Sequence, residues 1–403
     1  MMKTRISIIG TVGLPANYGG FETLTEHLVT KLSDEYDINV YCSGKKYSKE
    51  ERKSHYKGAK LTYLPFNANG IQSIIYDSLS IVHSVFKSDV LLILGVAGAW
   101  LLPFVKLFTK KRIIISIDGI EWKRDKWNTL AKWYLFWAES LAVKFSHIDI
   151  SDNEAIQDYT AQRYNSLSRI IEYGADHVLK VNPTIEDEYD YPFLLDDYAV
   201  KVCRIEPENH VHTVLEAFSV FQDMSLVFIG NWDNSEYGRE LKAKYRDVKN
   251  ITILDPIYDQ KKLDLIRGNA SLYIHGHSAG GTNPSLVEAM FLGLPIIANG
   301  VSYNRVTTED SAIYFNNLDQ LVKALMELDM QHLPKLGSKM AEIANRRYNW
   351  KLIAEKYKLL VVEALQIPVK KAVGGKLSSL TLSDLEQYEL AHLFNQDQFY
   401  VKR

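Results

Sequence analysis

The feature that most constrains this chain is an alternation of short β-branched runs with longer stretches of helical periodicity, and the alternation occurs twice. Such a pattern is typical of parallel sheets covered by helices. The first series of predicted strands comprises residues 5–10, 38–42, 90–94, 112–117 and 147–150. The second series comprises residues 198–203, 226–229, 251–254, 272–275 and 295–298. We therefore expect an α/β protein with two domains of similar size around a cleft.

The alternation stops near residues 182–197, where Pro183 and Pro192 flank an acidic run. Prolines and polar residues between periodic segments predict a linker. The predicted organisation is an N-terminal Rossmann-like domain over residues 1–180, a linker over 181–197, a C-terminal Rossmann-like domain over 198–366 and a tail over 367–403. Helices are predicted over residues 21–32, 130–145 and 211–221.

Composition limits the partners and the location of the chain. A formal net charge of −2 provides no global positive field, so we expect no nucleic-acid partner. Two cysteines in 403 residues fit a reducing compartment, and the apolar run at residues 6–9 is too short for a signal peptide. The apolar stretch over residues 90–105 falls short of the ~20 residues of a membrane-spanning helix and predicts a buried strand, a loop and a helix. We expect a cytoplasmic protein, and the sequence leaves open its attachment to a membrane surface.

The loop after the first predicted strand carries two adjacent glycines, Gly19 and Gly20, at the start of a predicted helix. Glycines there let a ligand approach the backbone, and the free N–H groups of a helix start can bind an anion. The loop has neither the Lys of a Walker motif nor the glycine spacing of a dinucleotide fingerprint. The alternative is a loop that needs its glycines only to turn.

A second loop follows the predicted strand at residues 272–275. Asn283 is a suitable N-cap and Pro284 suits the first helical position, so we expect a helix to begin there with its positive end available to a diphosphate. Glu288 lies about one turn into this helix among apolar residues, where a carboxylate usually holds a hydroxyl group or a cation. The alternative is an exposed glutamate on an amphipathic helix.

Arg204 follows the first strand of the second series. Its guanidinium could make forked hydrogen bonds to phosphate oxygens, or could form an ordinary surface ion pair.

Together these motifs resemble the retaining glycosyltransferases of family 4, which have the two-domain GT-B fold. Within that family the chain is most similar to bacterial rhamnosyltransferases that build capsule and cell-wall polysaccharides. The resemblance extends from residue 5 to about residue 360, and its motifs lie at residues 9–23, 117–127, 172–176, 204–209, 280–290 and 348–357.

The resemblance implies a donor and a set of site residues. Glu288 would hold the ribose of a nucleotide diphosphate sugar, dTDP-L-rhamnose, and Arg204 its diphosphate. Asp118 would face the donor sugar or the acceptor, and with Arg204 and Glu288 it completes the expected catalytic set. The remaining donor-binding residues would be Gly19, Gly20, Asn209, Gly281, Thr282 and Asn283. The implied acceptor is a polyprenyl-diphosphate-linked saccharide.

Two positions depart from the broad family, which has Glu where this chain has Gly280 and usually Lys where it has Asn209. The rhamnosyltransferase-like members share these changes, so they indicate donor specificity, although they could also mark a weakened enzyme. No Asp-x-Asp occurs in the chain, so we expect neither a metal nor a cofactor. Helix N-termini and Arg204 would offset the leaving-group charge. The resemblance implies front-face transfer with retention of configuration.

Five of the seven tryptophans lie between Trp100 and Trp137, interleaved with lysines and arginines. Aromatic residues beside basic ones favour the surface of an anionic membrane. Alternatively, Trp127, Leu130, Tyr134 and Trp137 form the buried stripe of one helix.

Other functions fit parts of the sequence. A periplasmic sugar-binding protein also has two α/β domains, but it needs an export signal that we do not find in this sequence. A GT-B transferase with a UDP-hexose donor and a catalytically silent GT-B scaffold both remain as alternatives.

Overall fold

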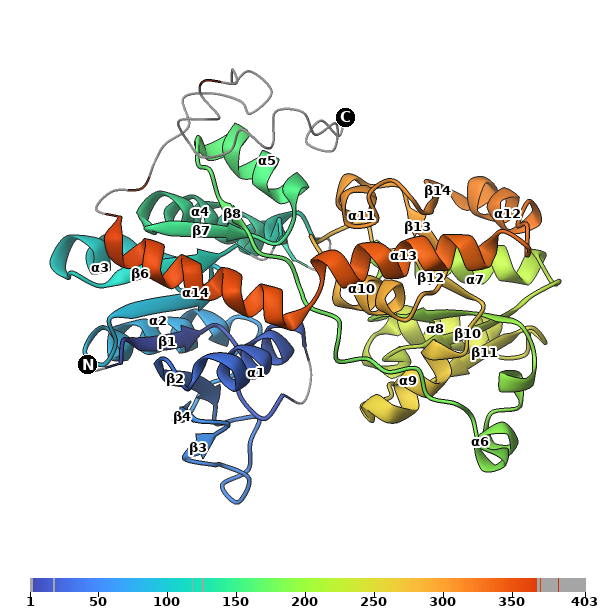
Figure 1. Cartoon of the computed structure of the whole chain (residues 1–403), viewed down its shortest axis with the longest axis horizontal. Helices are drawn as coiled ribbons and strands as arrows, with labels where there is room; N and C mark the ends of the chain where they lie inside the picture. Colours follow the sequence, from blue (N-terminus) through green and yellow to red (C-terminus); the bar gives the residue numbers. More distant parts are fainter. Residues whose placement is uncertain are drawn as a thin grey trace. The chain divides into compact units, whose positions relative to one another are not determined.

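The computed structural model describes residues 3–16, 19–117, 119–124, 127–367, 370 and 383. The chain forms two compact units, shown in Figure 1. Unit 1 contains residues 1–123, 127–172 and 350–403, and unit 2 contains residues 124–126 and 173–349. Each unit is an α/β domain built on its own sheet.

Unit 1 has an eight-stranded sheet in the order β3-β4-β2-β1-β5-β6-β7-β8. Its strands are β1 (Arg5–Ile9), β2 (Asp37–Ser43), β3 (His55–Tyr56), β4 (Ala59–Leu64), β5 (Val90–Leu94), β6 (Arg112–Ser116), β7 (Ile148–Ser151) and β8 (Arg169–Ile170). All neighbouring strands pair in parallel except β3 and β4. The central strand β5 is buried along its whole length, as expected for a parallel sheet with both faces covered.

The helices of unit 1 cover both faces of this sheet. They are α1 (Gly20–Leu32), α2 (Gln72–Val85), η1 (Ala99–Leu101), α3 (Leu102–Phe108), η2 (Glu121–Lys123), α4 (Thr129–Phe145), α5 (Glu154–Tyr164) and α14 (Trp350–Gln366). Helices α1 and α14 pack together in front of the sheet in Figure 1. From β1 the strand order continues to β5, β6 and β7, so right-handed crossovers place α2, α3 and α4 together on the opposite face.

The boundary predicted at residue 366 differs from the structure, because α14 packs on unit 1 rather than on unit 2. Trp350, at the start of α14, stacks on His27 of α1 with ring centroids 4.2 Å apart. Near the other end, Arg169 Nη2 donates to Glu363 Oε1 at 2.5 Å. The helix thus finds its apolar and charged partners in unit 1.

The predicted linker at 181–197 contains two short helical segments and belongs to unit 2. Helix α6 (Ile185–Asp190) begins with a reciprocal capping box between Thr184 and Asp187. Three of its four acidic residues, Glu186, Asp187 and Glu188, lie in the first turn, where the helix dipole stabilises negative charge. Most of the predicted tail, residues 367–403, lies outside the described residues.

Unit 2 has a six-stranded sheet in the order β11-β10-β9-β12-β13-β14, which is parallel throughout. The strands are β9 (Tyr198–Val202), β10 (Ser225–Ile229), β11 (Ile251–Leu254), β12 (Leu272–His275), β13 (Ile296–Asn299) and β14 (Ile313–Phe315). The remaining segments are η3 (Pro192–Leu195), η4 (Pro207–Asn209), α7 (Val211–Val220), η5 (Trp232–Asn234), α8 (Glu236–Tyr245), α9 (Gln260–Gly268), α10 (Pro284–Phe291), α11 (Ser302–Thr307), α12 (Leu318–Met326) and α13 (Leu333–Arg347). Phe218, Phe228 and Trp232 lie at the centre of the core.

The strand order places β9 between β10 and β12, so the chain leaves β9 and β12 in different directions at this point of the sheet. In open α/β sheets ligands bind beyond the carboxyl ends of the strands at such a point. The loops after β9 and β12 are therefore where the fold of unit 2 favours a site.

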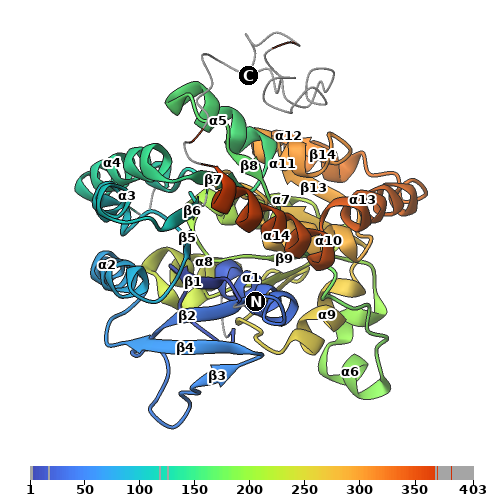
Figure 2. The same cartoon turned by 60° about the vertical axis from the view of Figure 1, so that its left-hand side comes forward.

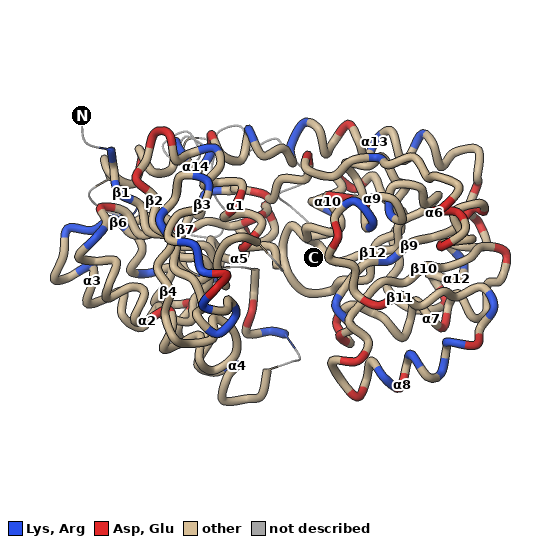
Figure 3. Tube along the Cα trace, turned by 90° about the horizontal axis from the view of Figure 1, so that it is seen from below, with Lys and Arg blue, Asp and Glu red and all other residues tan. Residues whose placement is uncertain are grey.

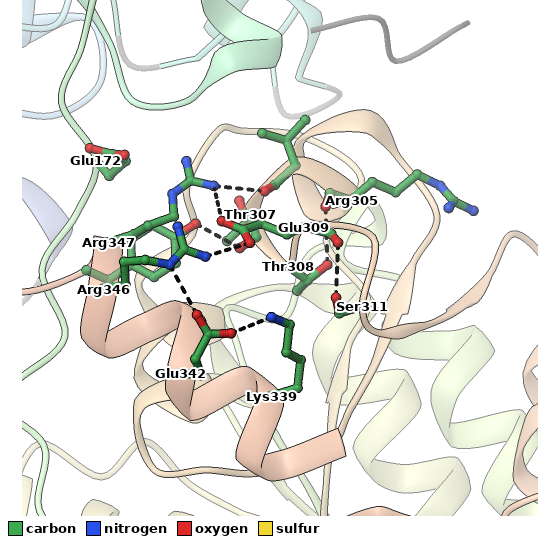
Figure 4. A network of polar contacts seen from close by, with 12 residues as sticks. Glu172, Arg305, Thr307, Thr308, Glu309, Ser311, Lys339, Glu342, Arg346 and Arg347 are labelled. Atoms are coloured by element: carbon green, nitrogen blue, oxygen red, sulfur yellow. Dashed lines mark hydrogen bonds and ion pairs between the residues drawn. The ribbon is translucent and has the colours of Figure 1, made fainter. Parts of the chain in front are cut away.

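A network of ion pairs holds the end of α13 against the segment that follows α11 (Figure 4). Glu309 accepts from Arg346 Nη2 at 2.7 Å and from Arg347 Nη1 at 3.3 Å. Arg346 also donates to Glu342 at 3.2 Å, and Lys339 pairs with the same carboxylate. The network fixes the last turn of α13.

Two of the sequence interpretations can be compared with the helices. The stretch at residues 90–105 forms a buried strand, a loop and a helix, as predicted. The alternative prediction, that Trp127, Leu130, Tyr134 and Trp137 form a buried stripe, is wrong. None of these side chains is buried, and Leu130 is 76% exposed. Helix α4 buries Ala138, Glu139, Ala142 and Val143 in its second half instead. Within the described ranges, we find no helix with the length and hydropathy needed to cross a membrane.

Candidate functional site

Helix α10 begins as its sequence predicts, with Pro284 in the first turn and Asn283 as the N-cap. Asn283 Oδ1 accepts from the Ser285 N–H at 3.2 Å and from Ser285 Oγ at 2.9 Å. Gly281 and Thr282 precede the cap, and Thr282 is buried. Gly280 has a φ of +123°, a conformation that residues with a Cβ rarely adopt, so the loop needs glycine here. The positive end of α10 follows the carboxyl end of β12.

The loops after β9 and β12 are joined by close contacts. A Cβ on Gly276 would lie 2.3 Å from the carbonyl oxygen of Asn209, so only glycine permits this approach. Ser278 donates both its N–H and its Oγ–H to the Glu208 carbonyl, each at 2.9 Å. His210 Nδ1 lies 2.8 Å from the Gly276 carbonyl oxygen. The two loops therefore form a single framework at the edge of the sheet.

Glu288 is held by two partners within unit 2. Arg267 Nη1 donates to Glu288 Oε2 at 2.5 Å, and His177 Nε2 lies 3.2 Å from Oε1. Burial alone would raise the pKa of Glu288, but the charge of Arg267 and the contact with His177 lower that pKa to about 2. The side chain is only 14% exposed, so the alternative of an exposed glutamate is wrong.

Of the two partners expected for Glu288, a hydroxyl group or a cation, the structure shows a cation, Arg267 of α9. Arg267 is fully buried and also pairs with Asp264 at 3.3 Å. An ionised carboxylate has about four lone-pair positions, so Glu288 can accept further hydrogen bonds beside these two contacts. Its carboxylate is thus fixed in place and still able to bind a hydroxyl group.

Arg204 follows β9, and its side chain is 42% exposed. Its ion pair with Glu206 is long, at 3.9 Å, which leaves its donors available to a ligand. Asn209 is buried, and its Nδ2 donates to the Arg204 carbonyl at 2.8 Å. Asn209 therefore shapes the loop that carries Arg204.

Three residues that the sequence interpretation did not assign lie beside these loops: the buried Lys201 in β9, the buried His275 at the end of β12, and the half-buried His277 just after it. Among the described residues, Lys201 Nζ, both ring nitrogens of His275 and Nδ1 of His277 have no hydrogen-bond partner. Burial lowers the pKa of all three side chains, and the Lys201 charge lowers the two histidine pKa values further. Arg204 and Arg124, both in unit 2, add to the positive charge around His277.

At their lowered pKa values the two histidine rings are neutral, and each ring offers one N–H that can donate to a phosphate oxygen. One signal in the sequence could have drawn attention to these three residues, because Lys201 is the only charged residue in an otherwise apolar strand. The role of His275 and His277 could not be inferred from their spacing alone.

The glycine loop of unit 1 packs on a buried carboxylate. Gly19 has a φ of +110°, and a Cβ there would lie 2.1 Å from Glu22 Oε2. Glu22 Oε1 accepts from the Val12 N–H at 2.6 Å and from Thr11 Oγ1 at 3.0 Å. The backbone and packing at Gly19 thus require glycine, as in the alternative that the loop needs its glycines only to turn. Gly20 is the first residue of α1.

Six of the predicted residues follow the carboxyl ends of the neighbouring strands β9 and β12 in unit 2: Arg204, Asn209, Gly281, Thr282, Asn283 and Glu288. Gly19 and Gly20 belong to unit 1, so their predicted contact with the same diphosphate stays a prediction. Asp118 lies outside the described residues.

Comparisons with protein families also divide the chain into an N-terminal and a C-terminal part, close to the boundary between the two units. Residues 3–176 match a family described as a domain of unknown function (DUF1972). Residues 194–347 match the family described as glycosyl transferases group 1. A comparison with curated protein sequences finds no match.

Solved structures show the same fold over most of the chain. Sucrose-phosphate synthase from Thermosynechococcus elongatus has 14% identity and a TM-score of 0.74, over 90% of this chain and 99% of that one. HepE from Anabaena, in complex with UDP and glucose, has 15% identity and a TM-score of 0.69, over 90% and 100%. Starch synthase IV from Arabidopsis thaliana, bound to ADP and acarbose, has 13% identity and a TM-score of 0.66, over 90% and 99%. The chain therefore has the GT-B fold of these glycosyltransferases, and its residues 194–347 match the glycosyl transferases of group 1.

Proposed function

We propose that this chain is a glycosyltransferase that binds a nucleotide diphosphate sugar in unit 2. The observation that carries the proposal is the fixed carboxylate of Glu288 on the same helix whose positive end begins at Asn283. A carboxylate suits ribose hydroxyl groups, and a helix N-terminus suits a diphosphate. Arg204 and Arg124 supply further positive charge at this edge.

The donor we propose is dTDP-L-rhamnose. The resemblance to rhamnosyltransferases supports it, and so does Gly280 in place of the glutamate of the broad family. A Cβ on Gly280 would meet nothing within 4 Å among the residues that the structure describes, so glycine leaves open space where the broad family has a carboxylate side chain. A 6-deoxy sugar carries a methyl group where a hexose carries a hydroxymethyl group, so it lacks the 6-hydroxyl and needs one polar partner fewer. HepE with UDP and glucose has the same fold, so a UDP-hexose is the alternative donor.

In the proposed reaction the bond between the anomeric carbon and the donor diphosphate breaks, and a bond forms from that carbon to an acceptor hydroxyl oxygen on the same face. The acceptor proton passes to the departing phosphate oxygen, and configuration is retained. Arg204 and the N-terminus of α10 stabilise the negative charge that grows on the diphosphate. Glu288 orients the nucleoside, and Asp118 contacts the donor sugar or the acceptor. This mechanism needs no metal ion.

The acceptor we propose is a polyprenyl-diphosphate-linked saccharide of capsule or cell-wall synthesis, used at the cytoplasmic face of the membrane. This proposal follows the resemblance and the exposed aromatic residues of unit 1. A catalytically silent GT-B scaffold would bind the donor and transfer nothing.

Two measurements on the purified protein test these proposals. The first compares the rise in melting temperature with dTDP-rhamnose, UDP-glucose and free nucleotides, because a ligand at 100 times its Kd adds about 2.7 kcal/mol of stability. We expect the largest shift with dTDP-rhamnose, and a larger shift with UDP-glucose would reject the deoxysugar. The second follows sugar transfer to a lipid-linked saccharide, where binding without turnover would identify a scaffold.

A further inference from the structure

Helix α2 has its apolar side facing outward. Ile71, Ile75, Leu79, Val82 and Phe86 follow the spacing of one helix stripe, and all five are exposed, with Ile71 85% and Phe86 76% exposed. In a water-soluble helix such a stripe normally faces the core.

The inward side of α2 is the more polar one. It buries Asp77, Ser80 and Ser84 together with Tyr76 and Ile81. The two serines satisfy their hydroxyl groups on the helix backbone, where Ser80 Oγ donates to the Tyr76 carbonyl at 2.8 Å and Ser84 Oγ to the Ile81 carbonyl at 2.7 Å. The exposed apolar stripe is therefore a separate face of α2 and not the margin of a wide apolar face that packs on the core.

Two neighbouring helices extend this surface. Phe104, Leu107 and Phe108 of α3 are exposed, the last two by 75% each. Trp133 and Leu130 are the most exposed apolar side chains of α4. Figure 2 shows α2, α3 and α4 along one side of unit 1, as their crossovers require. We call their outward stripes the apolar face.

The segment before α3 connects the three helices into one surface. Trp100 Nε1 donates to Ser78 Oγ of α2 at 2.9 Å, and Tyr134 of α4 donates to the Ala97 carbonyl at 2.5 Å. Helix α3 packs against both η1 and α4. Because an exposed apolar surface spread over three helices is unusual in a soluble monomer, it marks an interaction surface.

The charges around the apolar face are almost all positive. Residues 71–112 contain five basic residues and only two carboxylates. Lys87 and Lys110 are exposed, whereas Lys106 donates to the Ser146 carbonyl and Arg112 to the Leu365 carbonyl of α14. Asp77 is buried, and Asp89 is paired with Arg5 at 2.7 Å. Figure 3 shows the basic run that follows α3. In α4 the lysines are Lys132 and Lys144, and its single carboxylate, Glu139, is buried and accepts from Tyr159 and Tyr164.

We infer that the apolar face of unit 1 lies on an anionic lipid bilayer, with the side chains of α2, α3 and α4 at the level of the headgroups and the lysines against lipid phosphates. Exposed tryptophan and phenylalanine with flanking lysines are the side chains that bind this interface. A second copy of the chain fits the charge less well, because it would bring two sets of these cations together without carboxylates between them. The inference rests on the proposed lipid-linked acceptor for its purpose, but its test needs no turnover.

The test is co-sedimentation of the full-length protein with vesicles of equal parts phosphatidylglycerol and phosphatidylcholine, and with vesicles of phosphatidylcholine alone. We expect binding to the anionic vesicles at low salt and weaker binding at high salt, because salt screens exposed charges. Two substitutions together, Leu107→Glu and Phe108→Glu, remove exposed apolar contacts and should weaken binding by about 10-fold for each side chain. The pair Lys110→Glu and Lys111→Glu should weaken it by at least about fivefold for each lysine.

The control is Val220→Glu, which places one glutamate on an exposed apolar position of unit 2 and should leave vesicle binding unchanged. Donor-induced stabilisation, measured on every variant, separates this inference from the proposed function, because none of the substituted residues is among the proposed donor-binding residues. Absence of wild-type binding, or equal loss in Val220→Glu, would overturn the inference. Self-association of the protein without lipid, if Leu107→Glu with Phe108→Glu abolished it, would also overturn the inference, because a second copy of the chain would then cover the apolar face. Binding that requires removal of residues 371–403 would make that segment the occupant.

Discussion

At the scale of single residues, Glu288 combines a structural contact with a proposed binding role, so its replacement must preserve shape. Glu288→Ala would leave the buried Arg267 without its 2.5 Å partner and would cost about 3–5 kcal/mol of stability. Glu288→Gln keeps the side-chain volume and removes the charge. A hydrogen bond to a charged group contributes about 1.5–3 kcal/mol, so we expect donor affinity to fall by ~10- to 100-fold.

Donor affinity of Glu288→Gln can be measured by calorimetry at a temperature where the variant is folded. The control is Asp264→Asn, which alters the other carboxylate partner of Arg267 and should lower stability without changing donor affinity. Equal loss of donor affinity in both variants would mean that Arg267, rather than Glu288, determines binding.

Arg204 differs from Glu288 because it is half-exposed and only weakly paired in the protein. Arg204→Ala should therefore leave the melting temperature nearly unchanged. It should lower kcat at saturating donor as well as affinity, because the negative charge it faces increases as the diphosphate departs. Steady-state kinetics would check this, with Arg246→Ala, another exposed arginine of unit 2, as the control. Wild-type kcat in Arg204→Ala would place Arg204 outside the site.

At the scale of elements, Asp77 makes the stability of α2 depend on pH. Its Oδ1 is buried and has no partner within the described part of the chain, and burial raises the pKa of Asp77 to about 8. The protonated carboxyl is therefore the form that the folded state favours. Its stability contribution is fully present below the unfolded pKa, near 4, and is lost as the pH rises through about 8.

Asp77→Asn should remove this pH dependence. The free energy of unfolding of the variant, relative to that of the wild type, should then rise by ~1 kcal/mol for each pH unit between about pH 4 and about pH 8. Urea unfolding at a series of pH values measures the slope. Asp89→Asn serves as the control, because Arg5 lowers the pKa of Asp89 and its own titration lies below this window. A slope in Asp77→Asn equal to that of the wild type would contradict the prediction.

At the scale of the whole molecule, the last long helix belongs to the first unit. Trp350 is 1% exposed and stacks on His27, so Trp350→Ala removes a large buried side chain and should cost about 3–5 kcal/mol. Because the chain has two units, hydrogen exchange resolves the effect better than a single melting temperature. We expect faster exchange in β5 and β6 and unchanged exchange in β9 and β10. The exposed Leu359 of the same helix provides the control Leu359→Ala, which should change neither set of strands.

The sequence alone predicted many of the strands and the helix start at which the candidate site lies. Strands β1, β5, β9 and β12 and the start of α10 follow from β-branched runs and from the Asn283-Pro284 cap, which depend on residues close together in the chain. Sequence also selected Arg204 and Glu288, because ligands bind at the ends of parallel strands.

Contacts between distant segments could be decided only by the tertiary structure. Arg267, which holds Glu288, lies in α9. Lys201 and His275 lie on the adjacent strands β9 and β12. The place of α14 depended on a stacking partner, His27, at the opposite end of the sequence. The outward apolar side of α2 was likewise hidden, because periodicity shows that a helix has two different faces but not which of them the sheet covers. Local patterns therefore determined the elements, whereas side-chain burial and pairing required the packed fold.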